Sequence, residues 1–183
     1  MAVMATTNTF TQRLIGALSL DAAVYEDVEA DRTATGQALA VVLLSSVAAG
    51  IGARGLYEAS ISRLVFIGTV SLVAWVAWAL LTFEIGGRLM PEPQTRVDPG
   101  ELLRTIGFAS TPGLLRVFGI IPGATVPVFA ATAVWMLLAT IVAVRQALDY
   151  TSTSRAVAVC VLGWVLAIAV AAVLGLFFGP TLS

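Results

Sequence analysis

The sequence predicts an all-α membrane protein: a bundle of transmembrane helices with an amphipathic helix at its N-terminus. Of its 183 residues, 58% are apolar and only 11% are charged, whereas about a quarter of the residues of a soluble domain are charged. Four stretches contain no charged residue and are long enough, at about 1.5 Å per residue, to cross a hydrocarbon core about 30 Å thick. None has the period-2 alternation of a barrel strand, so each is predicted to be helical. The four stretches are residues 35–53, 64–83, 124–144 and 156–178.

Residues 1–34 are predicted to form a cytoplasmic, amphipathic and acidic entry to this domain. Thr9 and Gln12 have the spacing of a helix-capping box, and Phe10, Leu14 and Ala17 then fall on one helical face. No signal peptide is expected, because no apolar run follows a basic start. We interpret the acidic cluster that comes next as a solvated face, with a cation site or a basic partner as the alternative. The cluster comprises Asp21, Glu26, Asp27, Glu29, Asp31 and Arg32.

A fifth apolar stretch, residues 102–121, contains Arg104, Arg116 and Pro112. It is a broken fifth crossing, a re-entrant hairpin or a helix lying in the interface. If it crosses, seven of the ten arginines lie on the side of the N-terminus, and otherwise six do. The positive-inside rule therefore favours five crossings in the cell membrane, with the N-terminus cytoplasmic and the C-terminus outside. We expect a break near Pro112 and Gly113, with Arg104 at the cytoplasmic interface and Arg116 at the outer one.

The residue types argue against an enzyme. All ten basic residues are arginine and there is no histidine, so Schiff-base chemistry and imidazole base catalysis lack their side chains. The single cysteine, Cys160, cannot anchor a zinc site without histidine. No metal or cofactor is expected. Nucleic acid is not expected as a partner, because the net charge is -1 and no basic run is present.

Arg104 and Arg116 are the first candidates for a contact with lipid. A charge inside a bilayer is costly, so such residues face protein, water or a lipid phosphate, or extend to the nearer interface. The planar guanidinium is also suited to binding phosphate. Lipid binding and simple anchoring are equally compatible with this pair.

Two charged pairs with a spacing of four residues are further candidates for contacts with lipid or a partner. Glu84 and Arg88 follow the second apolar stretch, and Arg145 and Asp149 end the one at 124–144. Helical geometry would place each pair on one face. For Arg145 and Asp149 the functional interpretation is a docking site or gate on the cytoplasmic face, and for Glu84 it is a carboxylate that needs a partner at that depth. The favoured interpretation is an ion pair that anchors a helix end among the headgroups.

Small residues recur every four positions along the last stretch and predict a packing face. Such a ridge lets another helix approach closely, although its spacing does not tell whether the partner is in the same chain or in a second copy. The ridge consists of Gly163, Ala167, Ala171 and Gly175.

Tryptophans lie near the middle of three predicted spans, at Trp75, Trp135 and Trp164. Membrane tryptophan normally prefers the interfaces. Central placement therefore favours packing inside the bundle, with the lining of a hydrophobic pocket as the less favoured alternative.

Three segments together resemble the prokaryotic branch of the Yip1 family of multi-pass membrane proteins. They are YEDVEADRTATGQALAVV, RTIGFASTPGLLRVFGIIPG and AVRQALDYTSTSRAVAVCVLGW, and the likeness covers about Thr9 to Trp164. The resemblance implies one membrane domain over residues 1–183, with five crossings and a cytoplasmic N-terminus. The chain lacks the long polar N-terminal region and the acidic-aromatic motif of eukaryotic members, so binding of Rab GTPases does not carry over. The family has no catalytic residues to transfer.

Together these observations predict a non-enzymatic scaffold or organiser that acts through helix and lipid contacts. The expected partners are membrane lipids, with other membrane proteins or a second copy of the chain in addition. Two alternatives remain open at this point. One is a small transporter or channel-like module built around residues 102–121, and the other is an accessory subunit of a larger membrane complex.

Overall fold

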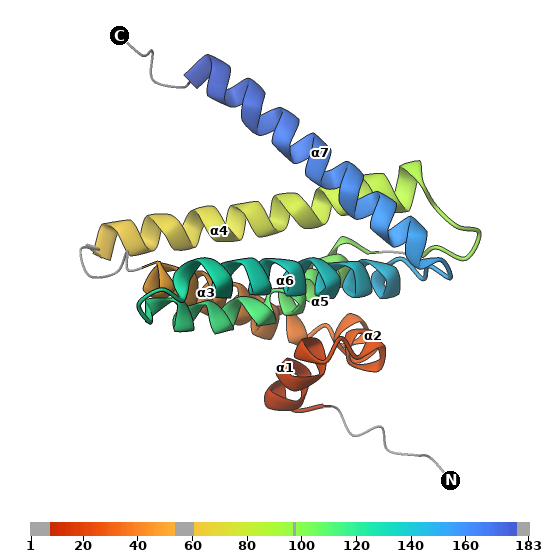
Figure 1. Ribbon diagram of the computed structural model, residues 1–183. Coiled ribbons are helices and arrows are strands. Elements are labelled where there is room, and N and C mark those ends of the chain that lie inside the picture. Colours follow the sequence, from red (N-terminus) through yellow and green to blue (C-terminus); the bar gives the residue numbers. More distant parts are fainter. Residues whose placement is uncertain (1–7, 54–60, 97, 179–183) are drawn as a thin grey trace.

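The computed structural model describes residues 8–53, 61–96 and 98–178, with the side chains of 61, 63, 64, 67, 168 and 170–178 left out. Over these ranges the chain is all-α, with seven α-helices, one π-helix and one 3-10 helix (Figure 1). The elements are α1 (Phe10–Leu18), α2 (Ala22–Ala30), α3 (Ala34–Gly52), α4 (Ile61–Thr82), η2 (Phe83–Leu89, π), α5 (Pro99–Ala109), η3 (Thr111–Ile120, 3-10), α6 (Thr125–Ala147) and α7 (Thr153–Phe178).

Three helices are long and apolar enough to cross a membrane, which indicates a membrane location. They are Ala34–Gly52, Gly68–Leu89 and Thr125–Ala147, and they correspond to three of the four predicted spans. The second runs further than predicted, because the chain continues as a π-helix after Thr82. The fourth predicted span lies in α7, in which the described apolar stretch is Thr153–Ala167.

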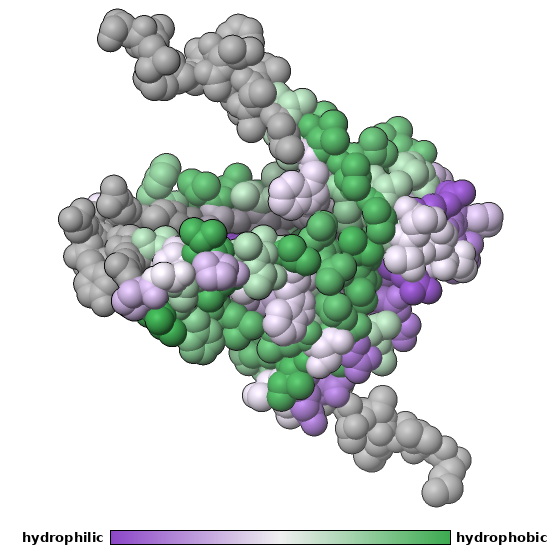
Figure 2. Space-filling model, viewed as in Figure 1, coloured by the Kyte–Doolittle hydropathy of each residue, from purple (hydrophilic) through white to green (hydrophobic). Residues whose placement is uncertain are grey.

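The surface of these helices is apolar. Val65, Phe66 and Val126 are 63%, 68% and 78% exposed, a pattern that suits contact with lipid rather than water. Figure 2 shows hydrophobic residues over most of the visible face. Hydrophilic residues gather at the end formed by the connections after η2 and after α6, and beside α1 and α2.

The predicted N-terminal helix is confirmed, including its cap. The Thr9 hydroxyl accepts a hydrogen bond from the Gln12 backbone N–H at 3.3 Å, and the Gln12 side chain accepts one from the Thr9 N–H at 2.8 Å. The predicted face of α1 packs inward, where Ala17 is fully buried. Asp21 then caps α2 by accepting from the Ala23 N–H.

The interpretation of the acidic cluster as a solvated face is wrong for two of its members, which bind an arginine of the same chain. Arg13 is 1% exposed and pairs with Asp27 at 2.9 Å and Asp31 at 2.7 Å. Its third nitrogen donates to Gln37 on α3 at 3.0 Å. The cluster folds back because a buried guanidinium is costly unless its charge and its donors are satisfied. This network joins α1, α2 and the start of α3.

Residues 102–121 are broken as predicted, and the break falls at Ser110. α5 ends at Ala109, and the chain continues as a 3-10 helix through Pro112 and Gly113. Proline lacks an N–H and clashes with the carbonyl four residues before it in an α-helix. That carbonyl belongs to Phe108, and the Thr111 hydroxyl satisfies it by donating at 2.5 Å.

The α5–η3 segment lies against α3 through three close contacts between small residues. A Cβ added at Gly107 would be 2.7 Å from the Cβ of Ala38, and one at Gly119 would be 3.0 Å from the carbonyl oxygen of Gly52. The contacts follow the same order along both elements, so the two run parallel. The pairs are Ala38 with Gly107, Ser45 with Gly113, and Gly52 with Gly119.

The polar end of the bundle fixes the start of α7. Glu92 is buried and accepts hydrogen bonds from the Thr151 backbone N–H at 3.0 Å and the Thr151 hydroxyl at 2.8 Å. Arg155 of α7 pairs with the same carboxylate at 3.5 Å. The Tyr150 hydroxyl lies 2.8 Å from the carbonyl oxygens of both Gly86 and Met90. The connections after η2 and after α6 therefore hold each other in place.

The closest contact between α3 and the α5–η3 segment is at Gly52, and it gives a direct test. A Cβ at Gly52 would overlap the backbone carbonyl oxygen of Arg116, which cannot rotate away. We expect Gly52→Ala to lower the free energy of unfolding by about 1–3 kcal/mol or more, as overpacked cores do. Gly36→Ala on the same helix is the matched control, because a Cβ there meets nothing within 4 Å. Unfolding titrations of both variants in mild detergent would contradict the packing if their stabilities were equal.

Candidate functional site

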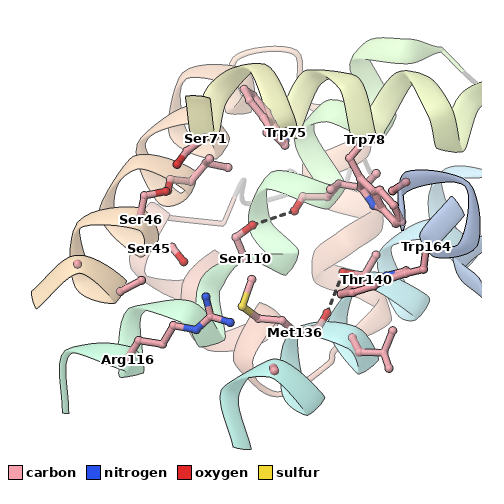
Figure 3. A pocket seen from close by; sticks show the side chains of 17 residues that line it. Ser45, Ser46, Ser71, Trp75, Trp78, Ser110, Arg116, Met136, Thr140 and Trp164 are labelled. Atoms are coloured by element: carbon pink, nitrogen blue, oxygen red, sulfur yellow. Dashed lines mark hydrogen bonds between the residues drawn. The ribbon is translucent and has the colours of Figure 1, made fainter. Parts of the chain in front are cut away.

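A cavity of about 680 Å³ lies among α3, α4, α5–η3, α6 and α7 (Figure 3). Most of its lining is apolar or aromatic, and the polar groups are a few serines, Thr140 and Arg116. Ligand sites of about 300–1,000 Å³ typically have this character, an apolar wall with a few polar groups that orient the ligand. This cavity is therefore the strongest candidate site in the described part of the chain.

Arg116 supplies the only charged side chain that lines this cavity among the described residues. Its Nε donates to the hydroxyl of Thr132 at 3.2 Å, and its guanidinium carbon lies 5.2 Å from the centre of the Phe129 ring. None of the ion pairs between described residues includes Arg116. Figure 3 shows its guanidinium pointing into the cavity, near Ser45 and Ser46. The arrangement leaves outer nitrogens of Arg116 able to bind an anion.

The opposite end of the cavity is aromatic. The rings of Trp78 on α4 and Trp164 on α7 meet edge to face, with their centres 6.0 Å apart. Gly163 makes this possible, because a Cβ there would lie 3.0 Å from the Trp78 ring. Trp75 lines the same wall while its indole N–H donates to the carbonyl of Leu103 at 3.1 Å.

The tryptophan prediction is therefore correct in part. Trp75 packs inside the bundle, and Trp135 donates its indole N–H to the carbonyl of Leu18 at 2.9 Å. Trp164, by contrast, is 54% exposed and lines the cavity. Trp75 lines the cavity as well, so the less favoured alternative, a pocket lining, applies to both Trp75 and Trp164.

Arg104, one of the two arginines whose sequence context allows either lipid binding or anchoring, binds the backbone of its own chain. It is 6% exposed, and it donates to the backbone carbonyls of Val28, at 3.1 Å, and Glu29. These carbonyls lie in the last turn of α2, where helix carbonyls lack internal partners and a cation is favoured. Arg104 is therefore the residue that joins α2 to α5.

Arg145 and Asp149 do not form the predicted pair on one helical face. α6 ends at Ala147, and Asp149 has a φ of 52°, so the chain has already turned. Arg145 instead donates to the carbonyl of Tyr150 at 3.2 Å. The carbonyl of Asp149 accepts a hydrogen bond from Gln94 at 3.1 Å.

Glu84 and Arg88 do form the predicted pair. Their side chains meet at 2.9 Å on η2 and are both more than half exposed. Arg88 also lies over the ring of Phe83, 5.3 Å from its centre. An exposed pair of this kind contributes little to stability.

Half of the predicted ridge on the last helix is described. Gly163 packs against the Trp78 ring of the same chain, and Ala167 lines the cavity. Ala171 and Gly175 lie outside the residues whose side chains the structure describes.

A second, polar cavity of about 400 Å³ lies where α2 meets the connection between α6 and α7. Its wall includes Glu26, Glu29, Arg145 and Asp149. Burial raises the pKa of Glu29 to about 7, and the neighbouring charges of Glu101, Asp149 and Glu26 add to that effect. Glu29 thus exchanges a proton near neutral pH.

Several residues of these sites were not singled out from the sequence. Arg13 had a visible sign, because it shares the face of Phe10, Leu14 and Ala17 and precedes the acidic cluster. Thr132 and Phe129 had none, since an apolar run does not reveal which of its residues faces a charge. Among the described residues, no three metal-ligating side chains lie close enough to hold an ion.

Comparison of the chain with protein-family models, curated proteins and solved structures finds no match. The resemblance to the Yip1 family thus receives no support from these comparisons and stays a prediction from the three segments.

The polar cavity predicts a pH dependence. The folded chain favours protonated Glu29, because the pKa of Glu29 is about 7 in the folded chain and about 4.3 in an unfolded chain. Its contribution to stability is complete below the unfolded value and is lost as pH rises through 7. Thermal unfolding in mild detergent should therefore show the melting temperature falling by a few degrees between about pH 5 and pH 8. Glu29→Gln should remove that fall, and Glu84→Gln, on an exposed carboxylate, should keep it; the opposite pattern would contradict the assignment.

Proposed function

We propose that this chain is a non-enzymatic integral membrane protein that holds an amphipathic anion in the cavity beside Arg116. The observation that carries the proposal is a guanidinium directed into an apolar and aromatic cavity without a carboxylate among its described neighbours. A cation in such surroundings favours a counter-charge. A guanidinium binds phosphate or carboxylate through parallel hydrogen bonds, and the aromatic end suits an apolar chain.

Five crossings are part of this proposal, with α5–η3 as the third. The segment runs parallel to α3, and α4 connects the two, as successive crossings require. A 3-10 helix rises about 2.0 Å per residue and an α-helix about 1.5 Å. With 10 and 11 residues, the segment extends over about 36 Å, which exceeds a hydrocarbon core of about 30 Å.

Within the membrane, the protein would act as a scaffold that organises lipid and neighbouring helices. Lipid in the cavity and lipid around the exposed apolar side chains are its partners, with other membrane proteins or a second copy as additional ones. The second candidate is a small transporter. A broken helix beside a cavity is the feature that favours it, since carriers bind substrate at interrupted helices.

Topology is tested by labelling single cysteines from each side of the membrane. In a Cys160→Ala background, we expect Thr7→Cys and Thr153→Cys to react from the cytoplasm and Ser183→Cys from outside. The reason is the arginine distribution, which places the end holding Arg145 and Arg155 inside. Labelling of positions 153 and 183 from the same side would refute five crossings.

The ligand is tested by purifying the protein in mild detergent and identifying the retained lipids by mass spectrometry. Arg116→Gln should lose most of the retained anionic lipid, because the only charge in the described cavity wall is removed. Arg116→Lys should retain part of it, since a point charge replaces a bidentate donor.

Arg88→Gln is the matched control, because Arg88 is an exposed arginine already paired with Glu84. Equal retention by Arg116→Gln and Arg88→Gln would refute the proposal. Solute flux in proteoliposomes would favour the transporter, and a stoichiometric protein that co-purifies would favour the accessory subunit.

A further inference from the structure

α7 contacts the rest of the bundle through a narrow stripe. Ala156, Val159 and Cys160 are at most 2% exposed, whereas Val161 and Val165 are 54% and 59% exposed. Figure 1 shows α7 crossing α4 obliquely, with its later turns diverging from the other helices. The start of α7 is held by the Arg155–Glu92 pair. The wall that α7 contributes to the cavity is therefore anchored at one end and loosely packed beyond it.

An aromatic pair lies where the described part of α7 meets α4. Trp164 belongs both to the cavity lining and to the exposed surface, so it stands at the boundary between the cavity and the outside of the bundle. Its partner Trp78 comes from the facing helix, α4. We call these two residues the tryptophan gate. Gly163 gives the Trp78 ring room against the α7 backbone.

The charged end of the cavity lies opposite the tryptophan gate (Figure 3). Figure 3 places Arg116, Ser45 and Ser46 at one end and the tryptophan gate at the other. An anion bound to Arg116 would direct its apolar part toward the gate. The surface beyond the gate is apolar, as the exposed side chains of α4 and α7 show. The volume of about 680 Å³ is within the range of sites for drug-sized ligands, which suits one apolar chain.

We propose that the cavity exchanges its ligand sideways with the bilayer, through the gap between α4 and α7, and that the tryptophan gate controls this exchange. The ligand is a membrane-resident anion with a single apolar chain, whose head binds Arg116 and whose chain passes between Trp78 and Trp164. This inference rests on the proposed function and adds the class of ligand and its route.

The experiment uses the full chain in phosphatidylcholine vesicles and a fatty acid brominated in the middle of its chain. Bromine quenches indole fluorescence on close approach, so binding reports on the gate directly. We expect saturable quenching that Arg116→Gln abolishes. Inorganic phosphate should not compete, because the route opens to lipid rather than water. Phosphate that displaces the fatty acid would overturn the lateral route.

The gate is tested by the rate at which bound brominated fatty acid leaves for acceptor vesicles, measured by recovery of fluorescence. Trp164→Ala should accelerate release by about two- to tenfold, the effect expected from loss of one edge-to-face aromatic contact. Trp75 and Trp78 still report in that variant. Leu162→Ala is the matched control, an exposed residue of α7 that does not line the cavity, and it should leave the rate unchanged.

The outcomes separate the two proposals. Saturable, Arg116-dependent quenching with equal release rates in Trp164→Ala and Leu162→Ala would overturn the gate and leave the proposed function intact. Quenching that neither saturates nor depends on Arg116 would overturn the proposed function itself. Trp164→Phe, which keeps a smaller ring, should release at an intermediate rate, and a rate equal to that of Trp164→Ala would argue against ring contact as the cause.

Discussion

The close contact between α3 and the α5–η3 segment is the constraint on which the candidate site depends. Gly52 has no side chain, so the backbone carbonyl of Arg116 can lie against α3. The 3-10 path has three residues per turn, which puts Gly113, Arg116 and Gly119 on one stripe facing that helix. With its backbone held there, the Arg116 side chain extends toward Phe129 on α6 and into the cavity. Packing of small residues thus determines where the charge lies.

Arg13, Arg104 and Arg116 are removed from solvent to different degrees, and each has a different partner. Arg13 is neutralised by two carboxylates, and Arg104 is bound by helix carbonyls. Arg116 has a hydroxyl and an aromatic face within the described structure. The hydroxyl accepts a hydrogen bond and the ring attracts the cation, but neither group supplies a counter-charge. This difference is the physical reason for assigning binding to Arg116 and structure to the other two.

The two ends of the bundle differ in how firmly they are held. At the polar end, Glu92, Tyr150 and Arg155 join the connections after η2 and after α6 to the start of α7. Further along the described part of α7, contact narrows to a stripe that includes Gly163 against the Trp78 ring. Proteins open locally in regions that make few contacts. The start of α7 is therefore held by polar contacts, and fewer contacts hold the described part beyond it.

Features that depend on neighbours in the chain can be predicted from the sequence. Apolar runs predicted the three helices long enough to cross a membrane, Thr9 and Gln12 predicted the first cap, and Pro112 predicted the break of residues 102–121. The partner of each charged residue, by contrast, depends on how the helices pack. Arg104 finds carbonyls about 75 positions away, and Asp149 leaves the helix that its spacing predicted. Such outcomes depend on which elements pack together, and local pattern carries no information about that, because helices of similar composition can pack by different faces.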